Sequence, residues 1–152
     1  MRAGRSGGFT LLELMVVVTI IAVLASIAYP AFNRQAARAR RTDAKDALMG
    51  IASAEERYFT NFNTYVTSLT TLGLNTSSPS GYYTLTVVPG SLSPTTCAVN
   101  AGAITTTYIL QAAIVNATAQ KGDVCGTLML DSSGVRCPNP SNVAANANGS
   151  CW

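Results

Sequence analysis

The chain has 152 residues, of which 48% are hydrophobic and 11% are charged, and its formal net charge is +3. The sequence contains no histidine, which excludes the catalytic pairs in which histidine activates a serine or cysteine nucleophile. Because a Cys-x-x-Cys motif is also missing, a structural zinc site is disfavoured, and we expect neither an enzyme nor a bound metal or cofactor. So small a net charge provides no electrostatic footprint for nucleic acid.

The N-terminal part consists of a short basic leader, Met1–Gly8, and an apolar segment, Phe9–Phe32, in which Glu13 is the only charged side chain. As a helix, this segment would extend roughly 36 Å, enough to cross a hydrocarbon core of about 30 Å. A secretory signal peptide would have its cleavage site after the apolar segment. A plain membrane anchor would avoid a carboxylate that costs up to about 3 kcal/mol in lipid, so Glu13 is predicted to be functional.

The run Gly-Phe-Thr-Leu-Leu-Glu-Leu-Met that begins at Gly8 resembles the type IV pilin family. In that family the prepilin leader ends in glycine, is cleaved before phenylalanine, and is followed four residues later by glutamate. Gly8, Phe9 and Glu13 fit this pattern. The resemblance implies cleavage between Gly8 and Phe9 by prepilin peptidase on the cytoplasmic side, followed by N-methylation of Phe9.

Cleavage would create a charged amino group on Phe9 at the end of an apolar helix, about 6 Å along the axis from the carboxylate of Glu13. Each charge alone is expensive in lipid. When subunits stack with an axial offset, Glu13 of one subunit can meet the amine of its neighbour, which predicts an assembly role. The alternative is that Glu13 extends to the lipid headgroups.

Pro30 interrupts the apolar segment, and we expect a helix kink or local melting there because proline removes a helical hydrogen bond. Alternatively Pro30 ends the anchor. We favour a helix that continues through Asn33–Asn61, with Glu55 and Glu56 in solvent. Apolar residues recur there at three- and four-residue spacing, which indicates one buried stripe: Ala44, Ala47, Leu48, Ile51, Tyr58, Phe59 and Phe62.

The arginines between Arg34 and Arg41 form a basic patch on the predicted helix. Two interpretations stand equally: attraction to lipid headgroups, or pairing with acidic residues of neighbouring subunits. Both place the patch outside the fold of its own chain.

The remaining chain predicts an antiparallel sheet. Residues 61–81 are rich in Thr, Ser, Asn and Gly and predict a loop, with its leucines packed on the core. Alternating or β-branched residues predict strands at 82–88, 107–115 and 125–131, and a short fourth strand at 135–136. A helix followed by consecutive strands indicates an α+β fold, in which a sheet of three to four strands packs on the helix. This element order also resembles the pilin fold.

Cys97, Cys125, Cys137 and Cys151 all follow the membrane segment, so we predict two disulfides formed in an oxidising compartment. Four cysteines allow three pairings, and the sequence does not choose. We prefer Cys97–Cys125 with Cys137–Cys151. The second bridge would enclose a C-terminal loop that resembles the disulfide-bounded D-region of pilins.

These features predict three parts: a leader at 1–8, a membrane and filament-core helix at 9–32, and a periplasmic or extracellular domain at 33–152. The resemblance implies a structural subunit of a type IV pilus, most like a minor pilin of the PilE kind. It would be held in the inner membrane before assembly and would then join other pilin subunits in a surface fibre. Such fibres serve adhesion, twitching motility or DNA uptake.

Two other functions remain open. A DNA-receptor minor pilin is disfavoured because the loop between Cys137 and Cys151 has no lysine or arginine, and only Lys121, Arg136 and Trp152 lie nearby in sequence. A calcium-binding pseudopilin of type II secretion is disfavoured because the same loop lacks acidic residues. Asp123 and Asp131 are predicted to be turn residues rather than calcium ligands.

Overall fold

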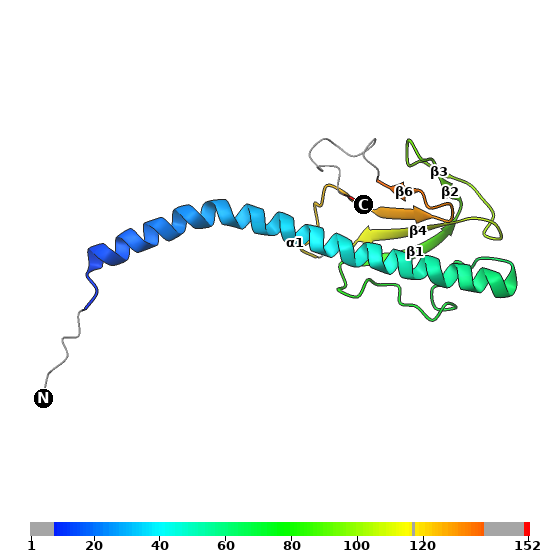
Figure 1. Ribbon diagram of the computed structural model, residues 1–152, viewed down its shortest axis with the longest axis horizontal. Helices are drawn as coiled ribbons and strands as arrows, with labels where there is room; N and C mark the ends of the chain where they lie inside the picture. Colours follow the sequence, from blue (N-terminus) through cyan, green and yellow to red (C-terminus); the bar gives the residue numbers. More distant parts are fainter. Residues whose placement is uncertain (1–7, 117, 139–150) are drawn as a thin grey trace, which may run out of the picture. The chain divides into compact units, whose positions relative to one another are not determined.

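The computed structural model describes residues 8–116, 118–138 and 151–152, apart from the side chain of Pro30. The chain divides into two compact units, Met1–Ala36 and Ala37–Trp152. The helix α1, Leu11–Phe62, begins in the first unit and ends in the second (Figure 1).

Thr10 starts α1. Its side-chain Oγ1 accepts the backbone N–H of Glu13 at 3.2 Å, and its carbonyl oxygen accepts the N–H of Leu14 at the same distance. Both bonds satisfy N–H groups that the first turn of a helix otherwise leaves without partners. The helix is continuous through position 30, as we favoured, whereas a kink there stays a prediction. After Phe62 the chain leaves the helix at Asn63, whose φ of 54° is the left-handed conformation typical of helix ends.

Four strands form one antiparallel sheet in the order β1-β4-β5-β6, and two further short strands, β2 and β3, form a separate pair. The strands of the sheet are β1 Tyr83–Pro89, β4 Tyr108–Ile114, β5 Leu128–Asp131 and β6 Arg136–Cys137, and the added pair is β2 Ser91–Leu92 with β3 Val99–Asn100. The α+β prediction with a sheet of three to four strands is confirmed, whereas the β2–β3 pair was not predicted.

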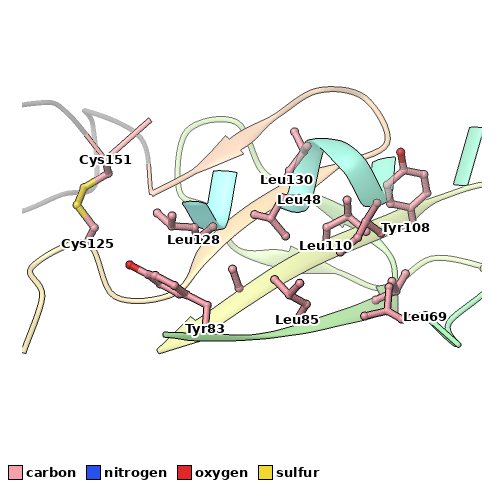
Figure 2. Packing of buried hydrophobic residues seen from close by; sticks show 14 residues of the cluster. Leu48, Leu69, Tyr83, Leu85, Tyr108, Leu110, Cys125, Leu128, Leu130 and Cys151 are labelled. Atoms are coloured by element: carbon pink, nitrogen blue, oxygen red, sulfur yellow. A yellow bond between two sulfur atoms is a disulfide. The ribbon is translucent and has the colours of Figure 1, made fainter. Parts of the chain in front are cut away.

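The main core lies between α1 and one face of the sheet, as Figure 2 shows. Alternate strand residues face the helix, so that Leu110 on β4 is opposite Leu130 on β5, and Leu48 of α1 packs against the same cluster. Leu48 and Leu110 are completely buried. Leu69 in the loop after the helix is also buried in this core, as predicted.

The predicted helical stripe is correct near the sheet and wrong at its end. Ala44, Leu48 and Ile51 are buried, but Phe62 is 62% exposed. The ring of Phe62 instead lies against the ring of Tyr58, with 4.4 Å between the centroids. The last turn of α1 therefore keeps an aromatic surface outside the core.

The cysteines form two disulfides, but the preferred pairing was wrong: the bonds are Cys97–Cys137 and Cys125–Cys151. The reason is the alternation of side chains along a strand. Cys137 is opposite Met129 in the sheet, and both belong to a second cluster with Leu92 and Cys97. Cys125 and Cys151 lie in the main core on the helix side. Each end of the C-terminal segment is thus held by a disulfide, although to a different partner.

Candidate functional site

The predicted processing and assembly motif lies at the start of α1. Gly8 and Phe9 precede the helix, and the side chain of Phe9 is 80% exposed. Glu13 is in the first turn, where a negative charge interacts favourably with the helix dipole. Within the described residues, the Glu13 carboxylate has no hydrogen-bond or ion-pair partner.

The apolar part of α1 is not covered by any of the residues that the structure describes. α1 is the one helix in the described residues that is long and apolar enough to cross a membrane, and none of its apolar window is buried. Its large apolar side chains are exposed by about half or more, including Leu11, Leu24, Ile27 and Phe32. So large an apolar surface marks a membrane or protein contact.

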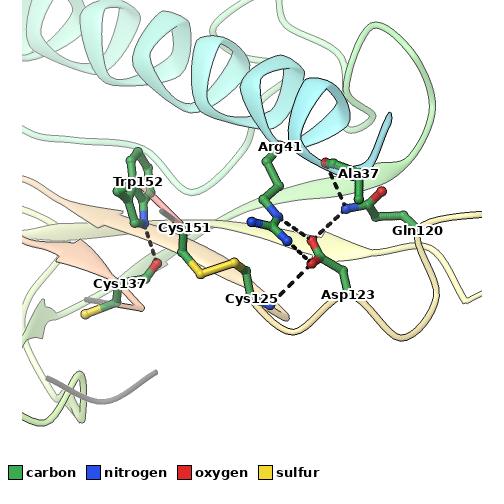
Figure 3. Close-up of a disulfide and its surroundings, with 8 residues drawn as sticks. All are labelled: Ala37, Arg41, Gln120, Asp123, Cys125, Cys137, Cys151 and Trp152. Carbon is green, nitrogen blue, oxygen red and sulfur yellow. Dashed lines mark hydrogen bonds and ion pairs between the residues drawn. A yellow bond between two sulfur atoms is a disulfide. The ribbon is translucent and has the colours of Figure 1, made fainter. Parts of the chain in front are cut away.

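A polar cluster joins the helix to the loop between β4 and β5 (Figure 3). Arg41 donates to both carboxylate oxygens of Asp123, with its Nε 2.8 Å from Oδ2. Gln120 donates to Asp123 at 2.6 Å and to the carbonyl of Ala37 at 3.4 Å. The side chains of Arg41 and Asp123 are only 8% and 3% exposed. This corrects both interpretations of the basic patch at Arg41, which is used inside its own chain.

A second cluster gathers basic and aromatic side chains around Trp152. The Lys45 ammonium on α1 lies 6.0 Å from the centre of the indole ring, and the Arg136 guanidinium on β6 lies 5.8 Å from it. These distances are those of cation–π contacts. The indole N–H donates to the carbonyl of Cys137 at 2.7 Å (Figure 3). Lys45 and Trp152 are half-buried and Arg136 is exposed. We call Lys45, Arg136 and Trp152 the Trp152 surface.

The Trp152 surface carries concentrated positive charge. Burial lowers the pKa of Lys45, and the neighbouring charges of Arg41 and Arg136 lower it further, against a weaker opposite effect of Asp46. Mutual repulsion of this kind is relieved when an anion binds. The sequence points to Arg136 and Trp152 but not to Lys45, because only the fold brings Lys45 to the same indole ring.

Two glutamates near the end of α1 behave differently from each other. Glu55 is completely buried, which contradicts its predicted place in solvent, and its Oε2 accepts the N–H of Val66 at 3.1 Å. Burial raises the pKa of Glu55, the hydrogen bond from Val66 opposes this increase, and the charge of Glu56 adds to it. Glu56 is exposed as predicted, but it accepts hydrogen bonds from the hydroxyls of Tyr65 and Tyr108. This cluster anchors the following loop to the helix.

Asp131 is a buried turn residue, as predicted. Its Oδ1 accepts the backbone N–H groups of Ser133 and Val135, each at 2.9 Å, and its Oδ2 accepts that of Leu92 at 2.8 Å. Asp123 lies in a turn as well, but its main contact is the ion pair with Arg41. In the part of the chain that the structure describes, no three His, Cys, Asp or Glu side chains are grouped so that they could hold a metal ion.

Two family models match successive parts of the chain. A family model for the prokaryotic N-terminal methylation motif matches residues 4–29. A second family model, described as "Type IV minor pilin ComP, DNA uptake sequence receptor", matches residues 30–129. A solved type IV pilin from Shewanella oneidensis superimposes with a TM-score of 0.49 and 28% sequence identity, over 72% of this chain and 98% of that one.

Two curated relatives each resemble part of the chain. The type IV major pilin protein PilA of Myxococcus xanthus is 43% identical over 61 residues, which are 40% of this chain and 28% of PilA. A fimbrial protein of Neisseria meningitidis serogroup B is 39% identical over 71 residues, which are 47% of this chain and 42% of that protein. The matched stretch thus spans less than half the length of either relative. The minor-pilin model, in contrast, covers more than half of the chain, and the chain therefore belongs to the type IV minor pilin family that this model describes.

Proposed function

We propose that this chain is a structural, non-catalytic subunit of a type IV pilus. It is made as a prepilin, held in the inner membrane by the apolar part of α1, and then built into a surface fibre with other pilin subunits. The observation that carries this proposal is the uncovered apolar helix that follows directly on the Gly8–Phe9 junction. Lipid covers that surface before assembly, and neighbouring subunits cover it afterwards.

Prepilin peptidase cuts between Gly8 and Phe9, and the new amino group of Phe9 is methylated. The match of residues 4–29 to the N-terminal methylation motif supports both steps. Within the described residues, the helix start is capped by the Thr10 side chain, and the Glu13 carboxylate makes no hydrogen bond or ion pair. It is therefore available to pair with the amine of an adjoining subunit, where two charges that are costly in an apolar medium neutralise each other.

The test is Glu13→Gln, which keeps the shape of the side chain and removes its charge. We expect the variant to be inserted and cleaved at Gly8–Phe9 but to be strongly depleted from sheared surface fibres. Lys121→Gln, a charge change at an exposed position, is the matched control and should enter fibres normally. Mass spectrometry of the fibres should find the wild-type chain starting at a methylated Phe9. Normal incorporation of the Glu13→Gln chain would refute the pairing mechanism.

A second proposed function is that of a DNA receptor within the pilus. The description of the matched minor-pilin model favours it, and the Trp152 surface supplies chemistry that suits it. Lys45 and Arg136 can neutralise phosphates, and the indole of Trp152 offers an aromatic face for a base. The sequence alone disfavours this function because only Lys121, Arg136 and Trp152 lie near the C-terminal loop in sequence, whereas the fold adds Lys45 to Arg136 and Trp152.

Binding of short single-stranded and duplex oligonucleotides to the full chain in detergent, measured over a range of salt concentrations, tests the receptor function. Lys45→Gln and Arg136→Gln should each weaken binding and reduce the slope of log affinity against log salt by about one. Lys121→Gln should leave the slope unchanged. Binding that is insensitive to Lys45→Gln and Arg136→Gln would place the DNA contact elsewhere or exclude it.

A further inference from the structure

Trp152 is held by two segments that each carry a disulfide. Its neighbour Cys151 is bonded to Cys125, and both cysteines are almost completely buried in the main core. Its indole N–H donates to the carbonyl of Cys137, which lies 15 residues earlier and is bonded to Cys97. Figure 3 shows Trp152 beside Cys151 and Cys137.

The two disulfides hold Trp152 in different ways. Cys125–Cys151 fixes the backbone directly before Trp152. In the part of the chain that the structure describes, Cys97–Cys137 is linked to Trp152 through the backbone carbonyl of Cys137 on β6. That strand is also held by its pairing with β5, in which Met129 is opposite Cys137. The carbonyl acceptor therefore keeps its place without the Cys97–Cys137 bond, whereas residue 151 loses its covalent tie to the core without Cys125–Cys151.

The Cys125 end of the Cys125–Cys151 disulfide is also held in place by contacts with the helix. Its backbone N–H lies 3.5 Å from Oδ1 of Asp123, and Asp123 is paired with Arg41 on the helix. Lys45 is one helical turn further along α1, four residues after Arg41. The ion pair, the disulfide and the Trp152 surface are thus connected through consecutive contacts.

We propose that Cys125–Cys151 is a redox-dependent positioning device for Trp152, so that the Trp152 surface is complete only in the oxidised chain. A dithiol reductant donates two electrons and two protons, the S–S bond breaks into two thiols, and the reductant closes to its own disulfide. The indole then leaves its place between Lys45 and Arg136. This regulation rests on the proposed DNA-receptor function, although the positioning of Trp152 can be measured without DNA.

The first experiment uses Trp152 as its own reporter, since it is the only tryptophan in the sequence. Fluorescence emission and iodide quenching are measured on the full chain in detergent for wild type, Cys125→Ala/Cys151→Ala and Cys97→Ala/Cys137→Ala. We expect the first pair to shift emission to the red and to raise iodide quenching at least twofold. The second pair should keep wild-type values. Equal effects of the two pairs, or no effect of the first, would overturn the proposal.

A second measurement covers the case in which a cysteine variant fails to fold. Wild-type chain is reduced with dithiothreitol under native conditions, the free thiols are alkylated, and mass spectrometry identifies the opened bond while far-UV circular dichroism reports the fold. Emission should shift in step with opening of Cys125–Cys151 and not with that of Cys97–Cys137. The opposite correlation would overturn the proposal.

The third measurement separates the positioning of Trp152 from the receptor function. If the oxidised wild type binds a short oligonucleotide, Cys125→Ala/Cys151→Ala should weaken binding at least about fivefold, as loss of a base–aromatic stack does. Adding Trp152→Ala to that variant should weaken it no further, and an additional loss would contradict the mechanism. If the oxidised wild type does not bind DNA, the receptor function fails, and the quenching result alone decides whether the disulfide positions Trp152.

Discussion

The substitution Arg41→Gln should markedly lower the thermal stability of the unit Ala37–Trp152, because it breaks an ion pair that is almost out of contact with water. The side chains of Arg41 and Asp123 are 8% and 3% exposed. Removing one partner of a buried pair leaves the other charge without compensation, which costs about 3 to 5 kcal/mol. Asp123 retains the amide of Gln120 at 2.6 Å, so we expect a value near the lower end of this range.

A loss of about 3 kcal/mol corresponds to a fall of about 12 °C in Tm for a folded unit of roughly 115 residues, at an unfolding entropy of about 2.1 cal/mol/K per residue. The assay is a thermal melt of the full chain in detergent, followed by near-UV circular dichroism and Trp152 fluorescence. Trp152 fluorescence reports the globular unit alone, whereas the near-UV signal also includes Phe9, Tyr29 and Phe32 of the apolar segment.

Arg38→Gln is the matched control, since it removes the same charge from an exposed position on the same helix and should shift stability by no more than about 0.5 kcal/mol. The double variant Arg41→Gln/Asp123→Asn should be less destabilised than the sum of the two single variants, because no unpaired charge remains. If Arg41→Gln melts at the same temperature as Arg38→Gln, the ion pair does not stabilise the fold and our reasoning is wrong.

Three further predictions concern buried groups. Burial raises the pKa of Glu55, so the folded state holds its proton more tightly and stability falls as pH rises above the ordinary value of 4.5. In urea denaturation, Glu55→Gln should therefore gain stability relative to wild type as the pH rises above that value. If the difference in stability between Glu55→Gln and wild type does not change with pH, this prediction is wrong. Leu48→Ala should cost about 2 to 5 kcal/mol in the same assay, because Leu48 is completely buried. Asp131→Ala should cost about 2 kcal/mol or more, since it leaves buried N–H groups without an acceptor; a loss no larger than that of an exposed substitution such as Arg38→Gln would refute it.

The sequence was sufficient for the features that depend on local pattern. The apolar segment, the motif at Gly8, Phe9 and Glu13, and the three main strands are visible in composition and alternation, and the structure places the strands within a few residues of the expected ranges. The alternation of buried and exposed side chains could not be recognised at β6, because this strand is only two residues long. So short a strand does not reveal which face Cys137 occupies, and the disulfide pairing depends on that face.

Some missed contacts had a signal in the sequence. Arg41 and Glu55 lie on the same helical stripe as Ala44, Leu48 and Ile51, at spacings of three and four residues. The spacing alone would have placed both charged side chains on the buried face. The charge of Arg41 instead suggested lipid headgroups or a neighbouring subunit, and that of Glu55 suggested solvent. Lys45 has the same spacing, four residues after Arg41 and three before Leu48, but the spacing does not reveal its place near Arg136 and Trp152, which is set by contacts between distant parts of the chain.

The cap that Thr10 places on α1 has a consequence for maturation. Gly8 and Phe9 lie just outside the first hydrogen-bonded turn, so the peptide bond proposed for cutting is not part of any helix. A protease that must draw an extended backbone into its cleft could engage this bond without unwinding a single turn. The anchor could then keep its shape while its leader is removed, and the newly exposed amine would emerge at a preformed helix end.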